Sequence, residues 1–282
     1  MQKERLDILL AERGLAESRS LAQKLVMAGQ VRVNGQVVLK PATKFPGDVT
    51  IQVDRGPRFV SRGGEKLEAA LVAFGLTDLG GRVCVDVGAS TGGFTDCLLQ
   101  HKAGKVYAVD VGYGELHWKL RNDPRVVVME RTNARYVEGF PEPPALVTID
   151  ASFISLRVLL PAVTQWLQEA GGEVVALIKP QFEAGRVEVS RGDGVIQDPQ
   201  IHRRVLQDVL DYAAGQGFAI QGLVRSPLKG PKGNIEFLVC LKLPQAEAAA
   251  PSSIEALIDA ALMDGLSVKP AGSEAAGSVN QN

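Results

Sequence analysis

The sequence predicts an α/β fold, in which a mostly parallel sheet with an antiparallel last strand follows a small α+β domain. From residue 66 onward, short apolar runs alternate with helical patterns, which is typical of parallel strands joined by crossover helices. The last two apolar runs, 219–226 and 234–243, have too short a connection for a parallel crossover, so we expect them to be antiparallel. Two helical patterns and a hairpin turn before residue 55 predict a separate domain.

The small domain is predicted over residues 1–55. Its helices are expected at 3–15 and 17–30, where apolar residues recur at helical spacing, and Ser18 or Ser20 is placed to cap the second helix. Asn34-Gly35 between two short apolar runs predicts a tight β-hairpin. Residues 56–63 are polar, basic and rich in glycine, so we expect an interdomain linker there.

The larger domain is predicted over residues 64–245. Strands are expected at 83–88, 105–112, 126–130, 145–153 and 173–182, with helices at 65–75, 92–102, 115–122, 155–170 and 202–217 between or beside them. The glycine-containing loop 184–198 is long enough to close over a bound ligand, which we state as a hypothesis. Residues 246–282 are rich in alanine, serine and acids, so we expect mostly disorder with a weak helix near 253–266.

Composition excludes several classes of protein. No apolar run approaches the roughly 20 residues of a membrane-spanning helix, and no signal peptide is recognisable, so we expect a cytoplasmic protein without a membrane partner. The three cysteines are odd in number and the three histidines lack metal-ligand spacing, so neither a disulfide framework nor a metal site is expected. The net charge is −1, but residues 1–60 carry +4 (ten basic, six acidic), which favours a polyanionic partner for the small domain.

A glycine-rich loop, DVGASTGGF at 86–94, follows the first strand of the larger domain. Its GxxxGG spacing is neither the dinucleotide GxGxxG pattern nor a phosphate-binding P-loop. Asp110 ends the next strand, where an acid can hold both hydroxyls of a ribose, and Asn133 follows the third strand, where it can contact a purine. Together these features favour S-adenosylmethionine over a pyrophosphate ligand. The alternative is a turn that needs glycine for packing alone.

Four charged residues form a second candidate constellation. Lys179 and Asp150 end neighbouring apolar strands, Glu236 lies within the last apolar run, and Lys66 lies at the start of the helix before the first strand. Each of them alone is more often a surface charge or a salt-bridge partner. Because all four can converge on one rim of the sheet, we interpret them together as a candidate catalytic site.

These motifs carry a resemblance to known families. DVGASTGGF with Lys66, Asp150, Lys179 and Glu236 in this order resembles the K-D-K-E tetrad of the Rossmann-like FtsJ-type RNA ribose 2′-O-methyltransferases. The stretch RLDILLAERGLAESRSLAQKLVMAGQVRVNGQVV is similar to the RNA-binding domain named after ribosomal protein S4. VSRGGEKL, RTNAR, DASFISL, IKPQFE, GVIQD and GNIEF resemble the TlyA family, which combines both domains and has also been named haemolysin. The resemblance covers residues 3–243.

The resemblance implies a function and a set of roles. It implies methylation of cytidine 2′-hydroxyls in ribosomal RNA of the large subunit, and in some members also of the small subunit. Lys179 would help to deprotonate the ribose hydroxyl, Asp150 would orient it, and Lys66 and Glu236 would complete the network. The cofactor S-adenosylmethionine would be held by Asp86, Gly88, Ala89, Ser90, Thr91, Gly92, Gly93, Phe94, Asp110 and Asn133, with Asp86 near its ammonium end and no metal needed. RNA would be bound by Arg5, Arg19, Ser20, Lys24, Arg32, Arg58 and Arg62.

Two other functions remain open from the residues. A membrane-active haemolysin is suggested by the family's second name, but the sequence has neither a spanning segment nor a strongly amphipathic cationic tail. An RNA-binding protein with an inactive transferase fold is disfavoured by the intact tetrad and glycine loop. Cofactor binding that depends on RNA is a further possibility, if the linker must first be ordered.

Overall fold

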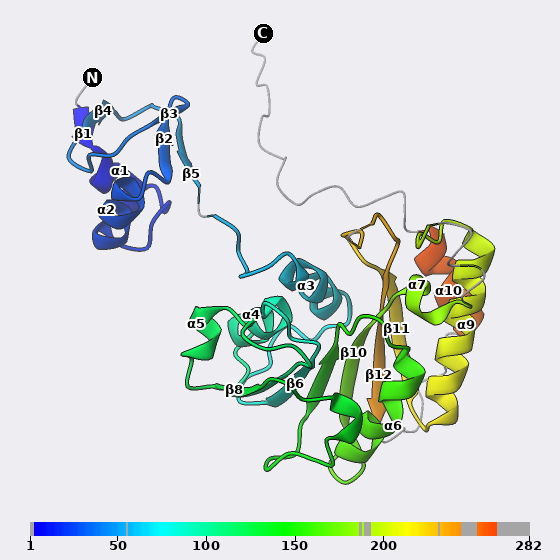
Figure 1. Ribbon diagram of the computed structural model, residues 1–282. Coiled ribbons are helices and arrows are strands. Elements are labelled where there is room, and N and C mark those ends of the chain that lie inside the picture. Colours follow the sequence, from blue (N-terminus) through cyan, green and yellow to red (C-terminus); the bar gives the residue numbers. More distant parts are fainter. Residues whose placement is uncertain are drawn as a thin grey trace. The chain divides into compact units, whose positions relative to one another are not determined.

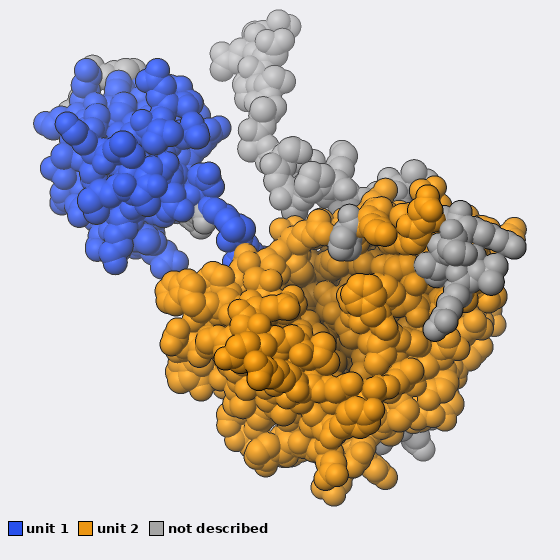
Figure 2. All heavy atoms as spheres, viewed as in Figure 1, with its two compact units in different colours: residues 1–58 blue, residues 59–282 orange. Residues whose placement is uncertain are grey.

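The computed structural model describes residues 3–54, 56–185, 188, 193–230, 232–243 and 253–263. It divides the chain into two compact units, Met1–Arg58 and Phe59–Asn282 (Figure 1, Figure 2). The division falls inside the segment expected to be a linker. Phe59 is only 3% exposed and packs with Leu67 and Leu71, because its apolar ring is covered by the first helix of the second unit.

The first unit contains two helices and two small sheets. Its elements are β1 (Lys3–Arg5), α1 (Leu6–Glu12), α2 (Arg19–Met27), β2 (Val31–Val33), β3 (Gln36–Val37), β4 (Lys44–Pro46) and β5 (Ile51–Val53). The expected hairpin is present as β2 and β3, and Asn34 and Gly35 both have positive φ, as its tight turn requires. Ser18 caps α2 by accepting a hydrogen bond from Leu21 N. The first helix is shorter than expected because Lys3–Arg5 pairs antiparallel with Lys44–Pro46.

The second unit is built around a seven-stranded sheet in the order β11-β12-β10-β9-β6-β7-β8. The strands are β6 (Val83–Val87), β7 (Lys105–Val109), β8 (Val126–Met129), β9 (Leu146–Ile149), β10 (Gly172–Ile178), β11 (Ala219–Arg225) and β12 (Phe237–Leu243). Strands β8, β7, β6, β9 and β10 are parallel, whereas β12 is antiparallel to both β10 and β11. The predicted fold class, including the antiparallel last strand, is therefore confirmed.

Helices cover both faces of this sheet (Figure 1). They are α3 (Gly63–Ala73), α4 (Gly93–Gln100) and α5 (Trp118–Arg121) on one side, and α6 (Leu156–Leu167), α9 (Pro199–Gly215) and α10 (Ile254–Met263) on the other, with short α7 (Pro180–Glu183) and the 3₁₀ turn η1 (Ala134–Tyr136) after strand ends. Alternate strand residues serve the two faces, as the two-residue period requires: Val85 and Val87 pack with α6, whereas Cys84 packs with α3 and α4.

Two expectations concerned segments outside the sheet, the tail 246–282 and the loop 184–198. The helix expected near 253–266 is present at Ile254–Met263, and Ile258 and Ala261 are fully buried in the core shared with α9, because the apolar face of the helix has a surface to cover. The rest of the expected tail lies outside the described residues. So does much of the loop 184–198, so the hypothesis that it closes over a ligand stays a hypothesis.

Candidate active site

The strand order of the second unit reverses between β6 and β9, because the chain adds β7 and β8 on one side and then β9 and β10 on the other. Ligands of doubly wound sheets bind at the carboxyl ends of the strands at such a switch point. A cavity of about 440 Å³ lies there. Its lining includes Gly88 after β6, Asp110 after β7, Asn133 after β8 and Asp150 after β9. The topology thus brings four of the predicted site residues together.

The glycines of the loop are required by close approaches within the protein. A Cβ on Gly88, whose φ is +82°, would lie 2.7 Å from the carbonyl oxygen of Asp150. A Cβ on Gly93 would lie 2.3 Å from Ser61 Oγ and 2.8 Å from Gly64 N. Gly92 lines neither this cavity nor the second one described below, and packs on Leu116 and Leu120 instead. Because Gly88 and Gly93 have no side chain, the loop can lie close to the end of β9 and to α3. This close approach fixes the shape of the cavity wall.

Asp110 has a fixed orientation at the rim of the first cavity. Its two carboxylate oxygens accept hydrogen bonds from Ser90 N at 2.8 Å and Gly112 N at 2.7 Å. Ser90 Oγ also donates to Glu115 at 3.2 Å, so the loop and the segment after β7 are tied together. Because a carboxylate has about four acceptor positions, Asp110 can accept two further hydrogen bonds from ligand hydroxyls.

Asp86 does not line either cavity, so the expectation that it faces a ligand needs correction. The strand period places its side chain, like Cys84, on the face covered by α4. There it is completely buried and accepts hydrogen bonds from Thr95 Oγ1 at 2.6 Å and Thr148 Oγ1 at 3.1 Å. Burial raises the pKa of Asp86 to about 7, against the opposing effect of the two threonines. Its position indicates a structural link between β6, β9 and α4.

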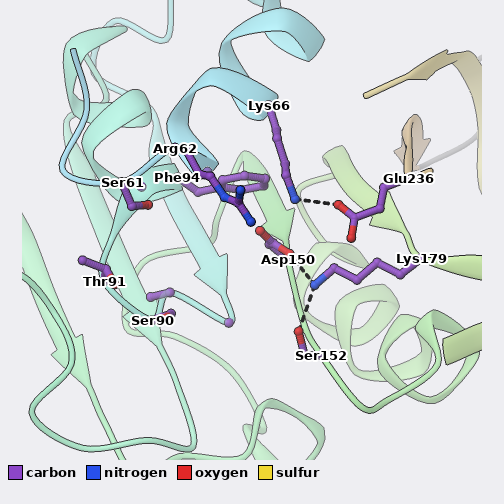
Figure 3. Close-up of a pocket in the computed structure, with 14 residues that line it drawn as sticks. Ser61, Arg62, Lys66, Ser90, Thr91, Phe94, Asp150, Ser152, Lys179 and Glu236 are labelled. Carbon is purple, nitrogen blue, oxygen red and sulfur yellow. Dashed lines mark hydrogen bonds and ion pairs between the residues drawn. The ribbon is translucent and has the colours of Figure 1, made fainter. Parts of the chain in front are cut away.

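The four charged residues of the predicted tetrad meet at the same edge of the sheet (Figure 3). Lys179 Nζ lies 2.6 Å from Asp150 Oδ1 and donates a hydrogen bond to Ser152 Oγ at 3.0 Å. Lys66 Nζ lies 2.5 Å from Glu236 Oε2. Lys66, Lys179 and Glu236 are 6%, 7% and 1% exposed, so each of these charges depends on its partner. Glu236 directly precedes β12 rather than lying inside it.

All four residues line a second cavity of about 310 Å³. Ala89, Thr91, Gly93 and Phe94 of the glycine loop line the same cavity, as does Arg62. Gly88, Ser90, Asp150 and Ser152 line both cavities, so the two adjoin along the ends of β6 and β9. A ligand in the first cavity can therefore present a group to a second ligand held beside Lys179.

Sequence reasoning missed several residues of this site. Ser152 is the second partner of Lys179, and Ser61, two residues before α3, lines the second cavity. Phe153 lines the first cavity, is 90% exposed and has a φ of +64°, a conformation that non-glycine residues seldom adopt. The segment that directly follows β9 in the sequence was the signal that could have indicated Ser152 and Phe153. Periodicity could not show, however, which way their side chains point.

Most of the residues predicted to bind RNA lie in the first unit, where some hold a buried carboxylate and others are exposed. Arg5 and Arg19 both bind the buried carboxylate of Asp7, at 2.9 Å and 3.0 Å. The bidentate hydrogen bonds from Arg5 hold the pKa of Asp7 well below its usual range, which overrides the effect of its burial. Ser20, Lys24 and Arg32 are exposed. Arg58 is exposed at the end of the first unit, whereas Arg62 belongs to the second.

The fold and the site together define a class: a doubly wound transferase sheet, with a loop-and-acid ligand site beside a buried lysine–carboxylate cluster, joined to a small basic unit. Residues 59–243 match the FtsJ-like methyltransferase family and residues 4–51 match the S4 domain. The TlyA cytidine-2′-O-methyltransferase of 16S and 23S rRNA from Mycobacterium tuberculosis is 43% identical over 94% of this chain and 99% of its own. This chain belongs to the TlyA family of FtsJ-like methyltransferases, which confirms the resemblance seen in the sequence.

Two further relatives span most of the chain. The Bacillus subtilis protein YqxC, named as a candidate rRNA methyltransferase, is 50% identical over 86% of this chain and 87% of its own. A solved structure of a hemolysin-named protein from Streptococcus thermophilus is 45% identical, covers 92% of this chain and 95% of its own, and superposes with a TM-score of 0.66. Both alignments thus cover most of this chain, in which the S4 and the FtsJ-like regions lie.

Proposed function

We propose that this protein transfers a methyl group from S-adenosylmethionine to the 2′-hydroxyl of a cytidine ribose in ribosomal RNA. The convergence of Lys66, Asp150, Lys179 and Glu236 on one cavity, beside a second ligand cavity, is the observation that carries the proposal. The names of the TlyA relatives supply the substrate class. The domain division follows the same proposal, with RNA binding in the S4 domain and transfer in the FtsJ-like domain.

The polar side chains that line the first cavity fit S-adenosylmethionine. Asp110 can accept hydrogen bonds from two ribose hydroxyls, and Asn133, at the N-terminus of η1, brings an amide to the purine side. The described residues that line the cavity include no lysine or arginine, which a phosphate ligand would favour. When bound, the sulfonium supplies an activated methyl group.

The residues of the second cavity can prepare the hydroxyl. Lys179 Nζ is fixed by Asp150 and Ser152, so it can hold the ribose oxygen in one position and stabilise the negative charge that develops as the proton leaves. Lys66 and Glu236 would form another wall of this cavity, as an ion pair whose two charges cancel. Because burial excludes much of the water from these side chains, their electrostatic interactions with the oxyanion are strengthened.

The test is methyl transfer by the full-length protein from tritiated S-adenosylmethionine to ribosomal subunits isolated from a strain that lacks the gene. We expect label in cytidine of the large subunit, and the small subunit tested in parallel would show whether it is also a substrate. Subunits from a strain that expresses the protein are the control, because their sites are already methylated. Cofactor binding without any transfer to unmodified subunits would contradict the proposal.

Hemolysin-named relatives make lysis the alternative function; one from Brachyspira hyodysenteriae is 46% identical over 83% of this chain. Among the helices that the structure describes, none has the length and apolar character to cross a bilayer. Lysis of erythrocytes by the pure protein, undiminished in Lys179→Ala, would favour that alternative.

A further inference from the structure

Three side chains with metal-binding chemistry meet between α3 and α4, outside both cavities of the site. Glu68 lies on α3, Cys97 on α4, and His101 directly follows α4. One ligand atom of each lies within 4.8 Å of the other two. Glu68 Oε2 is 2.8 Å from His101 Nε2 and 3.7 Å from Cys97 Sγ. A nitrogen, a sulfur and a carboxylate oxygen form the mixed ligand set that zinc accepts.

His101 has an oxygen atom within hydrogen-bond distance of each of its two ring nitrogens. Its Nδ1 lies 2.7 Å from the carbonyl oxygen of Thr77, which can only accept, so Nδ1 carries a hydrogen. Its Nε2 faces a carboxylate oxygen of Glu68, which is also an acceptor when ionised. A metal ion bound to Nε2 would therefore have a carboxylate oxygen within reach as a further ligand. A backbone carbonyl at the other ring nitrogen is the usual support of a metal-binding histidine.

We propose that Glu68, Cys97 and His101 form a site for a divalent thiophilic metal ion such as Zn²⁺, with water as the fourth ligand. Tetrahedral zinc bonds of about 2.0–2.3 Å place the ligand atoms roughly 3.3–3.7 Å apart. The distance from Cys97 Sγ to Glu68 Oε2 already has this value, at 3.7 Å. The distance from Nε2 to Oε2 must widen by about 0.5 Å, which flexible side chains allow. Magnesium and calcium are disfavoured because they prefer oxygen ligands.

Access and proton balance are consistent with such a site. The side chains of His101 and Glu68 are 11% and 21% exposed, which gives an ion an entry side, whereas Cys97 is fully buried. Binding would displace the thiol proton of Cys97 and any proton shared between His101 Nε2 and Glu68 Oε2, and these protons would leave to solvent. Cys97 and His101 are four residues apart, so they project from the same side of α4.

The ion would link two helices that shape the active site. Glu68 follows Lys66 by two residues on α3, and α4 begins at Gly93 of the glycine loop. A zinc bridge between them would therefore stabilise the wall of the catalytic cavity without contacting a substrate. The proposal is independent of the methyl-transfer function.

The test is titration of the metal-free full-length protein with Co²⁺, which reports a cysteine ligand through a thiolate-to-metal charge-transfer band. We expect the band to saturate at one equivalent in the wild type and to be absent in Cys97→Ser. Cys240→Ser removes another buried cysteine and is the matched control that keeps the band. Zn²⁺ should bleach the band, and at a hundredfold excess over Kd it should raise Tm by roughly 5 °C in the wild type and in Cys240→Ser but not in Cys97→Ser.

A second variant keeps the proposal falsifiable if Cys97→Ser does not fold. Glu68→Gln retains the shape of the side chain but loses the anionic ligand, and we expect its Zn²⁺ Kd to rise at least about tenfold. Absence of the band in the wild type, its persistence in Cys97→Ser or an unchanged Kd in Glu68→Gln would each overturn the site. The contact between His101 and Glu68 would then be a hydrogen bond between two helices only.

Discussion

At the scale of single residues, Lys179 combines burial with two fixed polar partners, Asp150 and Ser152. Such a lysine has little freedom to reach solvent, so its Nζ stays at the cavity that it lines. Asp86 is equally buried, but its partners are two threonine hydroxyls inside the protein. Two polar residues that look alike in the sequence, each near the end of an apolar strand, therefore have different roles.

Lys179→Ala should fold and bind S-adenosylmethionine but transfer methyl groups roughly 10²–10⁴-fold more slowly, because the oxygen of the ribose loses its positioned cationic partner. Lys179→Arg keeps the charge and shows whether charge alone suffices. Single-turnover methyl transfer measures both. Lys105→Ala, which removes a part-exposed pair with Glu142, is the control and should retain full activity. Full activity in Lys179→Ala would refute the assignment.

Asp86 predicts a pH dependence of stability. Its pKa rises from 3.8 to about 7 on folding, so the folded state holds a proton that the unfolded state releases. Its contribution is fully present below pH 4 and is lost as the pH rises through about 7, an effect of up to about 4 kcal/mol. Asp86→Asn should remove this component, which denaturant unfolding between pH 4 and 8 measures. Identical pH profiles for the two proteins would contradict the prediction.

At the scale of elements, the segment from β6 through the glycine loop to α4 sets the distance between the ligand cavity and the tetrad. The loop glycines were predicted to approach a ligand, yet Gly88 and Gly93 approach other backbone segments of the protein. Ala89, Ser90 and Thr91, between them, line the second cavity together with these two glycines. Gly88 and Gly93 thus serve the packing of the loop as well as the lining of the cavity.

Gly88→Ala should destabilise the protein by about 1–3 kcal/mol and weaken cofactor binding. The new Cβ would lie 2.7 Å from the carbonyl oxygen of Asp150, at a φ of +82° that alanine rarely adopts. Gly139→Ala is the matched control, because its Cβ would meet nothing within 4 Å. Denaturant unfolding and calorimetric titration with S-adenosylmethionine measure both effects. Equal stability of the two variants would show that the loop relaxes freely.

At the scale of the whole molecule, the chain joins a small unit with a net charge of +4 to a larger unit with a net charge of −5. Arg5 and Arg19 of the small unit hold Asp7, so their charges also stabilise its fold. Lys24 and Arg32 are exposed and available to phosphates. We therefore expect affinity for RNA and stability of the unit to depend on partly different residues.

Lys24→Ala and Arg32→Ala should each weaken RNA binding at all sequences and reduce the slope of log K against log salt by about 0.7–1, because each removes one phosphate contact. Arg19→Ala should in addition lower the midpoint of unfolding of the small unit, since Asp7 loses a partner while buried. Fluorescence titrations of an rRNA fragment at several salt concentrations measure the slopes. A slope unchanged in Lys24→Ala would place that residue off the RNA surface.

The sequence by itself determined the fold class, the family and the members of the tetrad, because strand–helix alternation and short motifs are local signals that neighbouring residues carry. Only the tertiary structure decided which polar side chains face the cavities. Lys66 and Glu236 are 170 residues apart, and the direction of Asp86, the partners of Arg19 and the meeting of Glu68 with Cys97 depend on contacts between elements. Periodicity shows that a strand is buried on both faces, but the partner on each face is set by how the helices pack.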